Sequence, residues 1–141
     1  MDHVVYLDAK AKELDKLLTG KKTMLIRGAA GRKIPYGRVD QGDILYLLEN
    51  DGTGRVCAKA NVGTVVNSEK MDTKQSAELI RLNQNKLKLT DAQLKRWSGK
   101  RYLVLVELMN IEKTKPFGID KTEYGNMDDW LLVGDILNVK I

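Results

Sequence analysis

One segment of this chain combines positive charge with backbone freedom in a way suited to holding a phosphate. Six lysines and arginines lie between residues 20 and 38, with no aspartate or glutamate among them. The same segment contains four glycines, Pro35 and Tyr36. Glycine lets backbone amides approach an anion, and a tyrosine ring can stack on a base. The pattern predicts contacts to RNA or a nucleotide through Lys21, Lys22, Arg27, Arg32, Lys33 and Arg38.

Two established nucleotide- or RNA-binding motifs do not fit this segment. A Walker-type phosphate loop needs glycine where this chain has Asp15, and serine or threonine where it has Lys22. Residues 28–31 have the Gly-x-x-Gly spacing of a KH clamp loop, but a predicted strand and coil flank them in place of two helices. The segment therefore predicts a basic binding surface that belongs to neither motif.

Composition excludes several other kinds of site. The chain has 141 residues, a net charge of +5 and a pI near 9.3, which fits a single domain over residues 1–141 with an anionic partner. Cys57 and His3 are the only cysteine and histidine, so they can build neither a zinc site nor a Ser-His-Asp triad. We expect no metal site and no cofactor.

The sequence also contains no segment that suggests a membrane or an export route. No apolar run reaches the length of a membrane span, and the N-terminus lacks the basic-then-apolar pattern of a secretory signal. Cys57 has no intrachain partner for a disulfide, and its alternating surroundings predict a buried strand thiol. We therefore expect a cytoplasmic protein without membrane contact.

The apolar pattern predicts a mixture of strands and helices. The expected strands are residues 3–7, 23–27, 44–48, 55–66 and 101–112. Residues 130–133 are expected as a final strand or a docking segment, and residues 136–141 as a further candidate edge strand. The expected helices are residues 9–19, 72–82 and 90–97. Asp8 is the expected N-cap of the first helix, and Pro116 is the expected end of the longest strand. Most connections are too short for parallel crossovers. The prediction is an α+β fold with five or six mainly antiparallel strands in a curved sheet or barrel, flanked by helices.

The order of elements, together with one short motif, resembles a known family. A helix is followed by residues 17–23, Leu-Leu-Thr-Gly-Lys-Lys-Thr, then by a strand that ends at Arg27 and another that follows Gly42-Asp43. This arrangement resembles the ASCH domain, of the PUA-like superfamily, over about residues 4–112. The resemblance implies a PUA-like open β-barrel with helices beside it. It also implies a cleft between them, lined by the Gly-Lys-Lys-Thr turn, that binds RNA or a modified nucleotide.

Some small ASCH proteins are similar to amidohydrolases that act on N-acylated cytidine, so hydrolysis is an alternative. In that comparison Lys22 corresponds to the reactive lysine, but Leu25 stands at the position of a second threonine. The position of the third group, a glutamate, falls near Leu87, and Glu78 is the nearest acid in that helix. A nucleophile needs an activated hydroxyl or thiol beside a base, and these residues do not supply one. The comparison therefore favours binding over amidohydrolase activity.

The combined prediction assigns roles to nine residues. Lys21, Lys22 and Arg27 form the cleft wall beside Thr23, while Arg32, Lys33 and Arg38 contact phosphate from the long loop at residues 28–43. Tyr36 and Trp130 stack on a base, although burial in the core is an alternative role for Trp130. A third possibility is a protein-interaction module, in which the basic loop docks an acidic protein partner.

Overall fold

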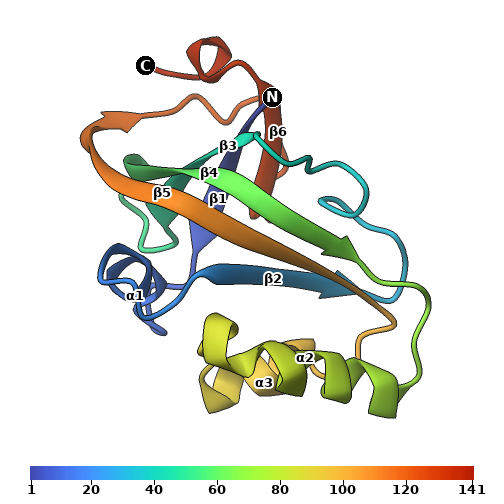
Figure 1. Cartoon of the computed structure of the whole chain (residues 1–141). Helices are drawn as coiled ribbons and strands as arrows, with labels where there is room; N and C mark the ends of the chain where they lie inside the picture. Colours follow the sequence, from blue (N-terminus) through green and yellow to red (C-terminus); the bar gives the residue numbers. More distant parts are fainter.

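Six strands form one curled, open sheet in the computed structural model, which describes residues 1–141 (Figure 1). The strands are β1 (Asp2–Leu7), β2 (Met24–Ala29), β3 (Ile44–Glu49), β4 (Arg55–Asn67), β5 (Tyr102–Gly118) and β6 (Trp130–Gly134). Their order across the sheet is β2-β5-β4-β3-β1-β6. Only β1 and β3 pair in parallel, and the other neighbours are antiparallel. The predicted α+β fold, a PUA-like open barrel, is confirmed.

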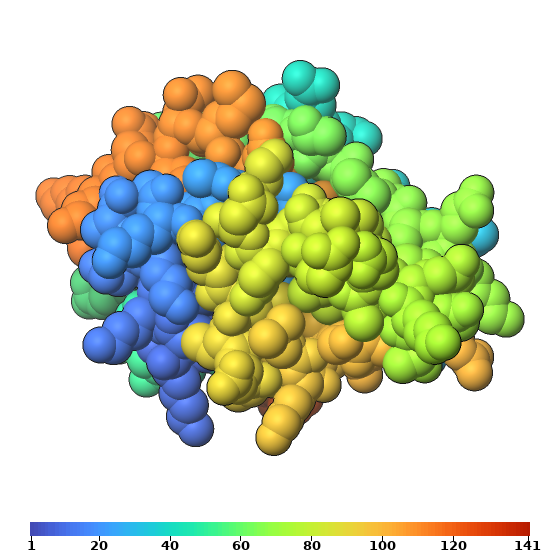
Figure 2. All heavy atoms as spheres, turned by 60° about the horizontal axis from the view of Figure 1, so that its bottom comes forward, coloured from blue at the N-terminus to red at the C-terminus, as the bar shows by residue number.

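Three α-helices pack beside the sheet. They are α1 (Glu13–Leu18), α2 (Thr73–Leu87) and α3 (Asp91–Trp97), and a short 3-10 helix, η1 (Ile136–Asn138), follows β6. Capping boxes start α2 and α3, because Asp72 and Thr90 each accept a backbone hydrogen bond from the residue three positions later. Figure 2 shows the face that α2 and α3 cover. Each helix is too short or too polar to span a lipid bilayer.

Strand β5 is the centre of the fold because both faces of its first half, up to Leu108, are buried. Val104, Val106 and Leu108 point into the barrel, where they join a cluster of fourteen buried residues that includes Trp130. Leu103 and Leu105 point the other way and pack with Ile80, Leu87 and Trp97 of the helices, among other residues. The alternation expected for a strand thus places one apolar set against the barrel and the next against α2 and α3.

Two strand predictions are wrong. Pro116 does not end the long strand, because β5 continues to Gly118 and pairs with the start of β4. The register shifts between the pairs Val56–Phe117 and Ala58–Lys113, so Pro116 lies in a bulge where its missing N–H is not needed. Residues 136–141 form no strand. Asp135 accepts a hydrogen bond from the backbone of Leu137 and starts η1 instead.

The helix boundaries also differ from those predicted. Asp8 does not cap the first helix. A turn separates it from α1, which starts only after Lys12, a residue with a left-handed backbone. Helix α2 runs beyond residue 82 to Leu87, whose buried side chain packs against the sheet. The side chain of Cys57 is half-buried rather than buried, because it faces away from Val56 and Ala58 on β4.

A substitution at Gly28 would test how tightly β2 packs on β5. A Cβ on Gly28 would lie 2.6 Å from the Leu103 side chain and 3.1 Å from the Tyr102 carbonyl oxygen. Overpacking of this kind costs about 1–3 kcal/mol, so we expect Gly28→Ala to lower the free energy of unfolding by that amount. Gly31→Ala is the matched control, because a Cβ there meets nothing within 4 Å. Urea unfolding checks both variants, and equal stabilities would contradict the packing described.

Candidate functional site

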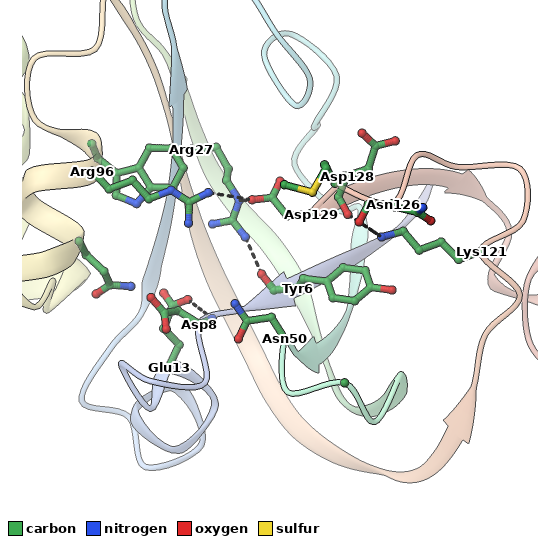
Figure 3. Close-up of a pocket in the computed structure, with 14 residues that line it drawn as sticks. Tyr6, Asp8, Glu13, Arg27, Asn50, Arg96, Lys121, Asn126, Asp128 and Asp129 are labelled. Atoms are coloured by element: carbon green, nitrogen blue, oxygen red, sulfur yellow. Dashed lines mark hydrogen bonds and ion pairs between the residues drawn. The ribbon is translucent and has the colours of Figure 1, made fainter.

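A polar cleft lies between the barrel and the helical side of the molecule (Figure 3). Its volume is about 370 Å³, and three of its fourteen lining residues are hydrophobic. The walls come from β1, α1, β2, the loop after β3, α3 and the segment before β6. The polar side chains labelled in Figure 3 are Tyr6, Asp8, Glu13, Arg27, Asn50, Arg96, Lys121, Asn126, Asp128 and Asp129.

The guanidinium of Arg27 is the buried cation of this cleft. Its Nη1 and Nη2 atoms donate hydrogen bonds of 2.8 Å to the carbonyls of Ile26 and Tyr6. The guanidinium carbon lies 5.6 Å from the ring centre of Trp130 and 6.0 Å from that of Trp97. The Nε atom is buried and has no hydrogen-bond partner, although Asp129 Oδ2 lies 3.3 Å away. The Nε atom of Arg27 is therefore held by the charge of Asp129 without a directed hydrogen bond, in a site lined by aromatic rings.

A buried hydrogen-bond chain positions Trp130 beside Arg27. The indole Nε1–H of Trp130 donates to His3 Nδ1 at 3.1 Å, so the Nε2 atom of His3 carries the proton and donates to Asp43 Oδ2 at 2.8 Å. His3 is fully buried, and Asp43 also accepts a hydrogen bond from the Asp40 backbone. The chain fixes the orientation of the indole from behind. Trp130 is thus buried in the core, which was the alternative role expected for it.

Lys22 and Glu13 form a buried ion pair beneath the cleft. Lys22 Nζ lies 3.2 Å from Glu13 Oε2 and also donates to the carbonyl of Leu87. Glu13 lines the cleft and accepts a 2.7 Å hydrogen bond from the backbone of Asp8. Burial lowers the pKa of Lys22; Glu13 opposes this shift, and the nearby charges of Arg27 and Lys16 add to it. Lys22 therefore joins elements beneath the cleft and exposes no surface to a ligand.

Charges of both signs line the cleft. Three cations, Arg27, Arg96 and Lys121, face four carboxylates, and Asp129 lies 3.3 Å from Arg27 and 3.7 Å from Arg96. The amides of Gln93, Asn50 and Asn126 add neutral donors and acceptors. A phosphate would be repelled by the carboxylates, whereas a planar polar group could use both kinds of partner. No group of three or more His, Cys, Asp or Glu side chains is arranged to hold a metal ion.

The structure separates the residues that the sequence places together. Arg27 lines the cleft and Trp130 packs behind it, but Lys22 is buried and Lys21 points into a different surface hollow. Thr23 is half-buried, and its backbone hydrogen-bonds to Lys86 and Leu108. The Gly-Lys-Lys-Thr turn therefore does not line the cleft, because β2 begins after it and carries the chain under the helices.

The loop predicted at residues 28–43 starts only after Ala29, because β2 continues to that residue, and it lies outside the cleft. The hydroxyl of Tyr36 donates to the Ser68 carbonyl at 2.5 Å, and its ring meets Tyr102 edge-on. The Arg32 guanidinium lies over both rings, at 5.8 Å and 5.7 Å. Lys33 and Arg38 are exposed. Tyr36 is therefore held by contacts with Ser68 and Tyr102 outside its loop, while the cations beside it remain open to solvent.

Several cleft residues escaped the sequence analysis because they come from distant segments. Glu13, Gln93, Arg96, Lys121 and Asp129 stand singly among ordinary surface residues, so no spacing links them. A signal existed only for Gln93, which occupies the third position of the α3 capping box. Its position in α3 gave no indication that the same residue also lines a cleft.

The buried ion pair predicts a coupled effect on stability. Glu13→Leu leaves the Lys22 charge buried without its partner and should cost about 3–5 kcal/mol in the free energy of unfolding. Adding Lys22→Met removes that charge, so the double variant should recover most of the loss. Urea unfolding of the two single variants and the double variant measures the coupling. Simple additivity of the two losses would contradict a paired Glu13 and Lys22.

The His3–Asp43 contact predicts an acid-dependent loss of stability. Burial raises the pKa of Asp43, but hydrogen bonds from the Asp40 backbone, His3 and the Met1 amino group outweigh it, so the pKa lies below its usual range. The stabilisation is complete above the usual aspartate pKa and is lost as the pH falls through the lowered value. We expect Asp43→Asn to cost about 1–3 kcal/mol at neutral pH and to flatten the acid limb. Unfolding measured between pH 7 and about pH 2 tests this, with the exposed Asp40→Asn as control.

Solved structures with the same fold exist, although the sequence alone finds no relative. No protein-family model matches the chain, and no curated protein is detectably similar to it. Three crystal structures of ASCH from Zymomonas mobilis, two of them of point mutants, align with TM-scores of 0.61, 0.67 and 0.62. Their sequences are 18%, 16% and 19% identical to this one.

The alignments extend over nearly the whole of this chain. They cover 83%, 93% and 91% of it, and 73%, 89% and 82% of the Zymomonas mobilis chains. At this level of identity the likeness establishes the arrangement of strands and helices. The order of elements that suggested the resemblance in the sequence is therefore matched in three dimensions. This chain has the fold of the ASCH domain, an open barrel of the PUA-like type.

Proposed function

We propose that this protein binds RNA, with one base or modified base held in the cleft and the phosphates outside it. The observation that carries this proposal is Arg27, whose buried guanidinium lines the cleft close to Trp97 and Trp130 and is paired with Asp129 at its Nε atom. Sequence-specific RNA recognition commonly uses unstacked bases that pack on aromatic or guanidinium planes and form hydrogen bonds through their edges. In the cleft lining, Arg27 and Trp97 offer these groups in one place, and Trp130 supports Arg27 from behind.

The size and charge of the cleft favour a base over a phosphate. A volume of about 370 Å³ lies at the small end of the range of ligand pockets, about 300–1,000 Å³, and suits a single nucleoside. Donors from Arg96 and Lys121 stand opposite acceptors from Asp128 and Asp129. A base edge presents donors and acceptors side by side, so it can satisfy both sets, whereas a phosphate only accepts.

The phosphate contacts would come from the loop at residues 28–43. Met127, Asp128 and Asp129 line both the cleft and a second hollow that includes Lys33 and Trp130. An RNA strand that leaves the cleft on this side therefore passes close to Lys33. Arg32 and Arg38 are exposed on the same loop and add positive charge to this route. The resemblance to ASCH domains supports the same class of ligand.

Amide hydrolysis on a nucleoside is a second candidate, and one observation favours it. Glu13 lines the cleft and is paired with Lys22, so a carboxylate and a lysine of lowered pKa lie together beneath a nucleoside-sized space. However, the contacts of the Lys22 ammonium are with Glu13 and the Leu87 carbonyl, and none is with a hydroxyl. Water would have to be the nucleophile, activated by Glu13. Release of cytidine from N-acylated cytidine would favour this candidate over simple binding.

RNA binding predicts an effect of Arg96 that Arg81 does not share. Both arginines are exposed on helices and pair with a carboxylate, but only Arg96 lines the cleft. We expect Arg96→Gln to weaken binding of single-stranded RNA about tenfold, equivalent to about 1.4 kcal/mol, because a charged donor to the ligand is lost. Arg81→Gln removes the same charge elsewhere and should leave the affinity nearly unchanged.

Fluorescence anisotropy with labelled single- and double-stranded RNA and DNA, at two salt concentrations, measures these affinities. Binding that weakens with salt is expected, because phosphate contacts release counterions. Equal affinities of the two variants would show that RNA avoids the cleft. Salt-sensitive binding to an acidic protein but to no nucleic acid would identify the protein-interaction module as the correct alternative.

A further inference from the structure

A separate surface hollow, distinct from the one beside Lys33, is lined by three lysines from separate parts of the chain. Lys16 comes from α1, Lys21 from the turn before β2 and Lys88 from the residue that ends α2. Gln84, Asn85 and Leu89 complete the lining, so the hollow contains no acidic residue. This is the hollow into which Lys21 points, and it lies outside the cleft described above.

The charges of these three lysines are not neutralised within the protein. No carboxylate lies within 4.0 Å of any of them, although the neighbouring Lys86 forms a 2.8 Å ion pair with Glu107. Asp15 precedes Lys16 on α1 but does not line the hollow. Lys22 lies buried nearby, and the charge of Lys16 acts on it. The hollow therefore presents concentrated positive charge to the solvent.

The end of helix α2 does not account for these lysines. Cations often lie near a helix C-terminus because its last carbonyls lack partners. Here the carbonyl of Gln84 accepts from the Lys88 backbone, that of Leu87 from Lys22, and that of Leu89 from the Gln84 side chain. Lys16 reaches the Lys88 carbonyl at 3.4 Å, but Lys21 and Lys88 make no side-chain hydrogen bond or ion pair. Their ammonium groups remain free for an anion from outside.

The hollow and the cleft take lining residues from the same parts of the chain, namely α1 and the α2–α3 segment. Glu13 lines the cleft, and Lys16 lines the hollow one helical turn further along α1, a rise of about 5 Å. On the opposite side, Gln93 lines the cleft and Leu89 the hollow. Figure 2 shows α1 and the turn after it, in blue, beside the yellow end of the α2–α3 segment. An RNA chain that leaves the cleft on this side would reach these three lysines next.

We propose that the hollow formed by Lys16, Lys21 and Lys88 binds the phosphodiester backbone of the RNA strand whose base occupies the cleft. This inference rests on the proposed RNA-binding function and extends it to a second, sequence-independent contact. Three ammonium groups without a carboxylate partner suit successive phosphates as point charges, and the exposed Asn85 adds a neutral donor. The strand would then be held on both sides of the cleft, by Lys33 on one side and by the lysine hollow on the other.

A comparison of two triple variants tests this surface. The first combines Lys16→Gln, Lys21→Gln and Lys88→Gln, and the control combines Lys70→Gln, Lys74→Gln and Lys113→Gln. The control removes the same charge from exposed lysines outside the hollow and the cleft that also lack an ion pair. A labelled single-stranded RNA of about 12 nucleotides, within the site sizes of such proteins, is titrated over a range of salt concentrations.

We expect the hollow variant to lower the slope of log affinity against log salt by about 2, since each single-strand phosphate contact contributes about 0.7. The control variant should keep the wild-type slope. Equal slopes in the two triple variants, with wild-type protein that binds RNA, would overturn the lysine hollow alone. Wild-type protein that binds no RNA would overturn the proposed function together with it.

Two further measurements distinguish a phosphate-binding hollow from a disturbed cleft and from a surface that binds protein. Binding of a single mononucleotide, measured by calorimetry, should be unchanged in the hollow variant, because it engages only the cleft. Loss of mononucleotide binding would show that the variant disturbs the cleft and would overturn the inference. Loss of polyglutamate binding with RNA binding retained would identify the surface as a site for an acidic protein, which also overturns it.

Discussion

The ammonium group of Lys22 joins α1 and α2 to the barrel, and the cleft and the lysine hollow both depend on this arrangement. It pairs with Glu13 of α1, donates to the carbonyl that ends α2, and stands at the start of β2. A lysine is rarely fully buried unless it is paired, since the loss of hydration must be offset by close partners. Because those partners come from α1 and α2, the charge can be satisfied only when the helical insertion is docked against the barrel. The groove between them is the result.

Two different electrostatic environments follow from this docking. Beneath the cleft, Glu13 and Asp129 balance Lys22 and Arg27, so the space above them is polar without a strong net charge. Around it, exposed lysines and arginines remain without acidic partners, on the loop at residues 28–43 and in the lysine hollow. Such a division suits a ligand with a polar, uncharged head and a charged backbone. It also explains why a net charge of +5 is a poor guide to the local character of the cleft.

The sequence predicts the type and order of most elements, and it fails where partners come from distant segments. The alternation of Tyr102 to Leu108 identifies the central strand because each face must bury every second residue. Pro116 gave a wrong end for this strand, because only the pairing with β4 shows that it lies in a bulge. The predicted ligand residues divide in the same way. Arg27 lines the cleft, whereas Lys22, one residue after Lys21, is turned inward just before β2 begins.

The sequence by itself determined the fold class, the basic character of residues 20–38 and the likeness to the ASCH domain, because periodicity, capping and charge are local properties. The tertiary structure decided which cations line the cleft, which line the hollow and which are buried. Residues adjacent in the chain, Lys21 and Lys22, end in a solvent-facing hollow and in the interior. Glu13, Arg96 and Asp129 meet in one cleft although they are far apart in sequence. Burial and ion pairing depend on these distant contacts, which no local pattern encodes.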